Sequence, residues 1–190
     1  MRSNGRESAD SDIAPADLPA EVLARFADDG AAQDAIDAAL AAARRYCGWH
    51  VSPSVTETIS VDGPGGRVLS LPTLNLTAVA SVTEADSAVD VSGLDRSQSK
   101  GTLTKRFGCW TRRDGAISVQ MTHGFTESEA ADWRRGIVAL VDARSQVSER
   151  AGDVKRDKVD DVETEWFSEA ISVDDELAAR FSQFRILPSP

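Results

Sequence analysis

The sequence predicts an α+β fold, in which a small helical bundle carries an inserted antiparallel β section and a C-terminal arm that ends in a short helix. Two changes in the spacing of apolar residues indicate this fold class. The spacing is helical up to about residue 50, alternates from Pro53, and becomes helical again at Thr126. The chain then divides into four segments: a disordered tail (1–16), a helical domain (17–150), the β section inside it (53–125) and a C-terminal arm (151–190).

Two helices are expected before the β section. A short apolar stripe begins after Asp17 and ends at 28–30, and it consists of Leu18, Val22, Leu23 and Phe26. A longer helix is expected from about Ala31 to Cys47, with Gly48 ending it and two arginines in its last turn complementing the helix dipole. One face of this helix is apolar and should be buried: Ile36, Ala39, Leu40, Ala43 and Cys47.

The β section is predicted from alternating apolar and polar residues. Val55–Val61 and Arg67–Leu71 are expected to be two strands around the glycine-rich turn 62–66. Thr102–Trp110 and Ile117–Met121 are expected to form a hairpin whose tip is Arg112-Arg113-Asp114-Gly115. Two more strands are expected: Ala78–Thr83 and, more weakly, Val89–Leu94.

The second helical region opens with a capping box, in which Thr126 and Glu129 satisfy free amide groups at the start of a helix. That helix should run to about Glu149. A charged, extended arm is expected over 154–167, followed by a last helix that Ser172 and Asp175 cap.

The charge of the chain limits its partners. Its 190 residues include 31 acidic and 21 basic ones, giving a formal net charge of -10. Tight binding of nucleic acid needs clustered Lys and Arg, so DNA is not expected as a tightly held ligand, although DNA that merely passes the protein remains compatible. We also expect no signal peptide, no membrane span, and reduced thiols at Cys47 and Cys109.

Two cysteines and two histidines raise a zinc hypothesis. Cys47 and His50 are close in sequence, while Cys109 and His123 flank the expected hairpin. Two thiolates and two imidazoles can bind zinc in a tetrahedral site, but structural sites usually show paired ligands at short spacing. No second cysteine lies near Cys109. The alternative, packed cysteines and histidines near surface turns, is favoured.

Other enzyme signatures are weak. Cys47 lies at a helix C-terminus, where the dipole disfavours the thiolate that a nucleophile needs. The glycines at 63–66 connect strands and open no helix, so they do not form a phosphate-binding loop. No catalytic residue, cofactor or bound metal is predicted.

The end of the chain is rich in large apolar groups beyond the charged arm. Two interpretations are open: these residues fold back on the core, or they are anchors that dock on another protein. They are Trp166, Phe167, Leu177, Phe181 and Phe184, with Arg180 and Arg185 nearby.

The order of these segments along the chain resembles that of a known protein family. Ala42–His50 ends a helix, Leu71–Leu74 precedes the strand Val79–Thr83, and Gly101–Leu103 leads to Gly108–Trp110. Val119–Phe125 then runs into the long helix, and a terminal helix closes on Phe184-Arg185. Over roughly residues 20–187 this order resembles the head–tail connector (adaptor) proteins of tailed bacteriophages. Two departures are Phe184-Arg185, where that family often has Tyr-Arg, and the charged segment 154–167.

The resemblance implies a structural virion protein without enzymatic activity. Such proteins form a ring, usually dodecameric, below the portal protein at the capsid vertex, after assembly in the host cytoplasm. The ring extends the DNA channel and binds the next tail-side protein, a stopper or a tail terminator. Alternatives are that this chain is itself another virion ring protein, such as a stopper or tail terminator, or a small metal-binding enzyme using Cys47, His50, Cys109 and His123.

Two expectations about residues follow from this resemblance. One helix-bundle face should contact a neighbouring copy, and the portal anchor should consist of Leu177, Phe181, Phe184, Arg185 and Ile186. The acidic side chains either repel DNA phosphates along a channel or simply keep the protein soluble.

Overall fold

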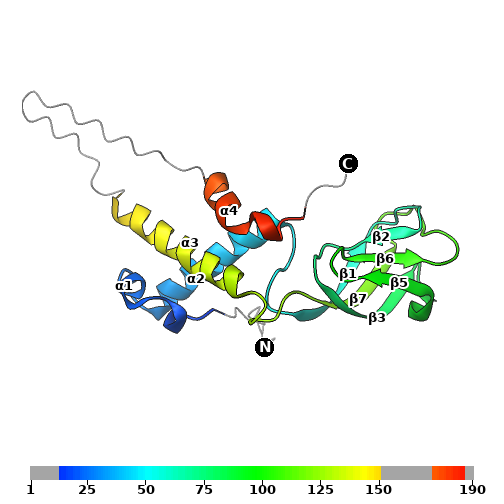
Figure 1. Ribbon diagram of the computed structural model, residues 1–190, viewed down its shortest axis with the longest axis horizontal. Helices are drawn as coiled ribbons and strands as arrows, with labels where there is room; N and C mark the ends of the chain where they lie inside the picture. Colours follow the sequence, from blue (N-terminus) through cyan, green and yellow to red (C-terminus); the bar gives the residue numbers. More distant parts are fainter. Residues whose placement is uncertain (1–12, 151–172, 187–190) are drawn as a thin grey trace, which may run out of the picture.

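The computed structural model describes residues 13–150 and 173–186 (Figure 1). The first twelve residues, the predicted arm at 154–167 and the Ser172 cap lie outside the described residues. The final residues of the predicted tail belong to the fold, because Ile13 is buried and Pro15–Asp17 forms a 3-10 helix. The side-chain carboxylate of Asp17 accepts the backbone N–H of Ala14 at 2.8 Å.

The molecule has a helical section at one end and a β section at the other (Figure 1). Each section has its own cluster of buried apolar side chains. The predicted α+β class, with a β section inserted into a helical framework and a short final helix, is confirmed.

The first part of the helical section follows the sequence closely. α1 (Ala20–Leu23) is short, and α2 (Asp29–Cys47) begins where the Asp28 carboxylate accepts the N–H of Ala31. Gly48 ends α2 with φ 82°, a left-handed conformation that favours glycine. The predicted apolar face of α2 is buried: Ile36, Ala39, Leu40, Ala43 and Cys47.

The second part contains α3 (Ala131–Arg150), α4 (Val173–Phe181) and the 3-10 turn η3 (Ser182–Phe184). The predicted box forms in the turn before α3, where the Glu129 carboxylate accepts the Thr126 N–H at 2.9 Å. The Thr126 hydroxyl donates to the same carboxylate instead of capping a helical amide. α2, α3 and α4 pack on one another around the buried side chains of the helical section.

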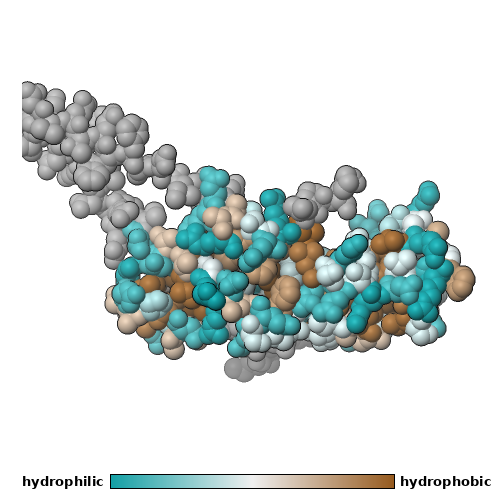
Figure 2. Space-filling view, viewed as in Figure 1, coloured by the Kyte–Doolittle hydropathy of each residue, from teal (hydrophilic) through white to brown (hydrophobic). Residues whose placement is uncertain are grey.

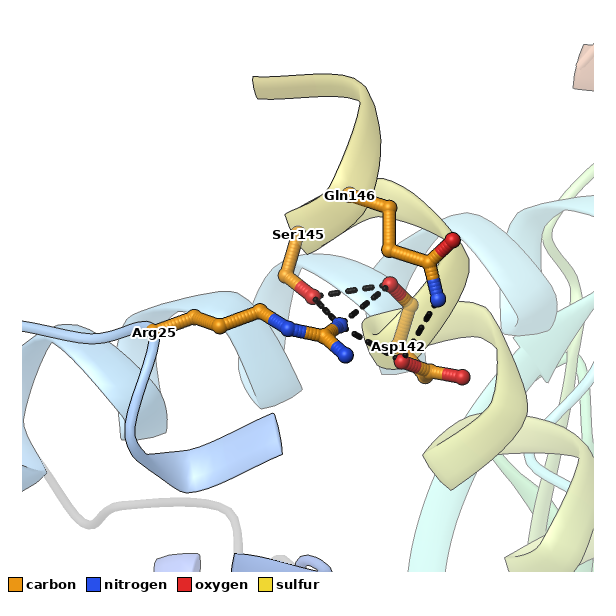
Figure 3. A network of polar contacts seen from close by, with 4 residues as sticks. All are labelled: Arg25, Asp142, Ser145 and Gln146. Carbon is orange, nitrogen blue, oxygen red and sulfur yellow. Dashed lines mark hydrogen bonds and ion pairs between the residues drawn. The ribbon is translucent and has the colours of Figure 1, made fainter. Parts of the chain in front are cut away.

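A polar network joins the segment after α1 to α3 (Figure 3). The Arg25 guanidinium lies 2.6 Å from a carboxylate oxygen of Asp142 and 2.8 Å from the hydroxyl of Ser145. Gln146 donates to the same carboxylate oxygen. Because Arg25 and Asp142 are more than 100 residues apart in sequence, this network ties the first helical turns to the second half of the section.

The β section consists of two antiparallel sheets. The four-stranded sheet has the order β1-β7-β3-β4, and the three-stranded sheet has the order β2-β6-β5. The strands are β1 (Val55–Val61), β2 (Val68–Ser70), β3 (Leu76–Glu84), β4 (Ser87–Val89), β5 (Leu94–Ser97), β6 (Thr102–Lys105) and β7 (Ile117–His123). Side chains from both sheets share one core, which includes Leu69, Leu103, Val119 and Met121.

The two pairings expected from the sequence are wrong. β1 pairs with β7 and not with β2, and β6 pairs with β2 and β5 and not with β7. The expected turns instead pass from one sheet to the other, and they bind each other: the Gly63 N–H donates to the Arg113 carbonyl at 3.0 Å. The strand expected over Val89–Leu94 is interrupted by a 3-10 turn that the Asp90 carboxylate caps.

Among the described residues, no helix is both long enough and apolar enough to cross a membrane.

Candidate interaction site at the junction of the two sections

Two chain segments join the sections, and hydrogen bonds to their backbone carbonyls hold both in place. The outgoing segment follows Gly48 and the returning segment precedes α3. The Phe125 N–H donates to the Val51 carbonyl at 2.8 Å, and the Asn75 side-chain amide donates to the Gly124 carbonyl at 2.9 Å. The junction is therefore a connected framework on which nearby side chains can be positioned.

The C-terminal end of the described chain binds this framework. The indole N–H of Trp49 donates to the Phe184 carbonyl at 2.6 Å, and the Ile186 N–H donates to the Cys47 carbonyl at 2.9 Å. These bonds attach the residues after α4 to the end of α2. Residues that are far apart in sequence thus meet at one place.

Edge-to-face aromatic contacts also hold the C-terminal end of the described chain in place. The ring centroids of Trp133 and Phe181 are 4.9 Å apart, and those of Trp133 and Phe184 are 5.6 Å apart. Phe125 contacts both Phe184 and Trp49 in the same manner. Five aromatic side chains from four segments therefore form one cluster at the junction.

The predicted anchor residues divide into two groups. Leu177 is 5% exposed and Phe181 is 0% exposed, so for these two the structure shows the chain folded back on its own core. Phe184 and Ile186 are half-buried, and Arg185 is exposed with its guanidinium 4.9 Å from the ring centroid of Tyr46. That these five residues bind a portal stays a prediction.

An open hollow of about 410 Å³ lies beside the aromatic cluster. Its apolar lining is formed by Trp49, Leu74, Phe125 and Phe184, and its polar lining by Glu129, Asp132 and Gln183. Figure 2 shows apolar surface where the helical and β sections meet. The hollow combines aromatic walls with two carboxylates, a composition suited to an apolar group next to a positive charge.

The four candidate zinc ligands do not come together. Cys47 is buried at the end of α2, and burial raises the pKa of its thiol to about 12. Cys109 is exposed in the β section. Across 13–150 and 173–186, no group of three or more Cys, His, Asp or Glu side chains could hold a metal ion.

His50 and His123 do lie side by side, with ring centroids 5.9 Å apart. His123 is buried and its Nε2 lies 2.9 Å from the Glu57 carboxylate. Burial is the largest cause that lowers the pKa of His50, and the nearby Arg44 lowers it further. The sequence does not indicate this pairing, because it depends on the contact of β1 with β7.

A feature that the sequence prediction missed lies after β6. The strand expected over Thr102–Trp110 ends at Lys105, and Phe107 is 90% exposed in the loop that follows. Gly108, at φ 73°, is the residue that could have indicated the turn. The sequence interpretation placed Phe107 inside a strand.

Comparison with solved structures extends the description of the fold. A chain in the neck of a native GTA particle, computed with C12 symmetry, has a TM-score of 0.52 at 13% identity, covering 91% of this chain and 86% of that one. A chain in the virion of a native gene transfer agent (GTA) particle has a TM-score of 0.56 at 15% identity, covering 87% and 81%.

A third chain, in the neck of an empty GTA particle computed with C6 symmetry, has a TM-score of 0.55 at 15% identity, covering 87% of this chain and 82% of that one. At these identities the likeness shows a shared fold. No protein-family model matches the chain, and no curated protein does either.

Proposed function

We propose that this protein is a structural, non-enzymatic component of a virion neck, where copies of it form a ring that joins the head to the tail. The observation that carries the proposal is the likeness of nearly the whole chain to chains in the necks of gene transfer agent particles. The order of motifs along the sequence supports the same class. The ring is proposed to have twelve subunits.

The shape of the subunit suits a ring. A closed ring needs two different complementary surfaces on each subunit, because each copy contacts its neighbours head to tail. The helical section and the β section offer such different surfaces at opposite ends (Figure 1). The proposed ring lies below the portal, continues the DNA channel, and binds a stopper or tail terminator on its other side.

The portal contact is proposed at the C-terminal end of the chain. Arg185 is exposed there, and Ile186 is half-buried. Leu177, Phe181 and Phe184 serve this contact by attaching the end of the chain to α2 and α3, through the bonds and ring contacts described above. Since Phe181 is fully buried, its replacement would test folding and not binding.

DNA is proposed to pass through the ring without being held. The formal net charge of -10 disfavours the multiple phosphate contacts that give tight binding. Acidic side chains on a channel wall would repel the phosphates as the genome moves.

Co-purification with the portal protein tests the function. Wild-type protein should bind the portal assembly, and Arg185→Glu should weaken that binding at least tenfold, because it reverses the charge of the exposed residue at the proposed contact. Lys100→Glu makes the same change of charge on the exposed turn between β5 and β6 and should bind like wild type. Equal binding by both variants would refute the contact at Arg185, and no binding by wild type would refute the proposed function.

A further inference from the structure

Phe107 is the starting observation. It is 90% exposed, although burial of a phenylalanine side chain stabilises a protein. The other large apolar residue exposed in the part of the chain that the structure describes is Val68, which lies on β2 opposite Thr104 of β6. Both therefore belong to the three-stranded sheet or to the loop that leaves it.

The loop that carries Phe107 is held in place at both ends. The N–H of Lys105 donates to the Arg67 carbonyl at 2.9 Å, and the N–H of Trp110 donates to the Gly66 carbonyl at 2.8 Å. The Arg67 guanidinium donates to the carbonyls of Lys105 and Arg106. A loop braced in this way holds Phe107 out at little further entropic cost on binding.

Basic side chains flank Phe107. Arg106 precedes it and is 53% exposed, with its Nε 2.8 Å from the carboxylate of Asp95. Arg67 lies beside the loop, whereas the Lys105 ammonium is largely buried and pairs with the Glu84 carboxylate. The loop thus presents an aromatic ring next to positive charge, in a protein whose overall charge is strongly negative.

The hollow at the junction has a lining that is chemically complementary to the Phe107 loop. Its walls are the apolar side chains of Trp49, Leu74, Phe125 and Phe184. Its polar lining includes Glu129 and Asp132, and Asp132 also lies 3.4 Å from Arg135 of the same helix. A cavity of about 150 Å³ holds a benzene ring. The volume of about 410 Å³ therefore accommodates a phenylalanine side chain and leaves room at the rim for a guanidinium.

The loop and the hollow lie at different places on the subunit. β1 leaves the junction at Val55 and ends at Val61, and the turn after it carries Gly66, whose carbonyl accepts the N–H of Trp110. The loop between β6 and Trp110 therefore lies at the end of the β section remote from the helices, the end at which β6 finishes in Figure 1. The hollow lies at the junction, next to η3. One copy therefore does not bring the two together, so only two different copies can bring them into contact.

We propose that the Phe107 loop of one copy inserts into the hollow of the next copy, with the ring of Phe107 against Trp49 and Phe125 and Arg106 facing Asp132. This contact rests on the proposed function, and it specifies how neighbouring subunits of the ring bind. The contact uses two unlike surfaces, so it propagates from copy to copy until the ring closes.

A cross-linking experiment tests this arrangement. Cys109 lies two residues from Phe107 and is exposed, while Cys47 is buried. Gln183→Cys places a second accessible thiol at the hollow without removing a residue of the proposed contact. Treatment of the assembled variant with a short bismaleimide should give a ladder of covalent dimers, trimers and larger species on a denaturing gel.

The controls separate this contact from others. Adding Cys109→Ser to Gln183→Cys should abolish the ladder. Asp37→Cys, which changes an exposed aspartate on α2, should give no ladder. A product that stops at the dimer would indicate a two-fold contact and would overturn the proposal, as would equal ladders from Asp37→Cys and Gln183→Cys.

A second variant needs no cross-linker. Phe107→Ser should leave the melting temperature unchanged, because the side chain is exposed, and should lower the fraction of assembled protein at least tenfold. Phe107→Leu should retain part of the assembly. Rings that form normally from Phe107→Ser overturn this contact alone, whereas wild-type protein that stays monomeric even with its portal overturns both this contact and the proposed function.

Discussion

A Cβ atom added to Gly136 of α3 would lie 2.7 Å from Cε1 of Phe181 on α4, a distance that real Cβ atoms essentially never show. Phe181 also contacts the ring of Trp133, one turn earlier on α3. The missing side chain at 136 thus creates the space in which α4 packs. This packing places the residues after α4 at the junction.

Gly136→Ala should therefore weaken the packing of α4. We expect the unfolding free energy to fall by about 1–3 kcal/mol, the usual cost of overpacking, although alanine is the better helix former. Denaturant unfolding followed by tryptophan fluorescence would measure it. Gly66→Ala is the matched control, since no atom lies within 4 Å of a Cβ there. Equal effects of the two changes would contradict the close contact.

The Arg25–Asp142 pair should make stability depend on pH. The hydrogen bond from Arg25 is the largest cause that lowers the pKa of Asp142 below its usual 3.8. Because the pKa is lowered in the folded state, the pair stabilises the fold at pH values above the usual pKa of Asp142. This contribution is lost as the pH falls through the lowered pKa of the folded state.

Arg25→Met should accordingly lower the melting temperature at neutral pH, by an amount that corresponds to about 0.2–1 kcal/mol for a partly exposed pair. Thermal melts of both proteins between pH 7 and the acid limit of folding, roughly pH 3, would show the difference shrinking as Asp142 becomes protonated. A difference that is constant over this range would show that the charge of Asp142 plays no part.

The two thiols should react very differently. Cys47 is buried under the C-terminal end and its pKa is raised to about 12, while Cys109 is exposed. A thiol reagent at pH 8 should therefore modify one cysteine in the folded protein and both after denaturation. Cys109→Ser should show no fast reaction. Rapid modification of Cys47 in the folded wild-type protein would contradict the docking of residues 181–186 over α2.

The sequence was sufficient to predict features that depend on local periodicity and capping. The extent of α2, its buried face and its glycine cap follow from spacing within one segment, and they are confirmed. The same is true of the bounds of β1. Such features need no knowledge of distant parts of the chain.

Strand pairing could not be predicted in this way. The glycine-rich turn after β1 and the turn before β7 both suit a hairpin, yet each leads into a different sheet and they bind each other through Gly63 and Arg113. These bonds join residues about 50 positions apart, so no local pattern indicates them.

For the same reason, only part of the candidate interaction site could be predicted from the sequence. The aromatic residues near the end of the chain stood out in the sequence, and two interpretations fitted them equally. Burial decides this for Leu177 and Phe181. The hollow could not be predicted, because Trp49, Phe125 and Phe184 come together only in the folded chain. The exposed Phe107 loop could not be predicted either, because it depends on β6 ending at Lys105.

The central claim is that copies of this chain assemble into a ring at a virion neck, and direct imaging tests it best. Purified protein should be examined by negative-stain electron microscopy with and without its portal protein, with mass photometry to count subunits. We predict annular particles of twelve copies, seated on the portal when it is present. Protein that remains monomeric in both samples would contradict the claim.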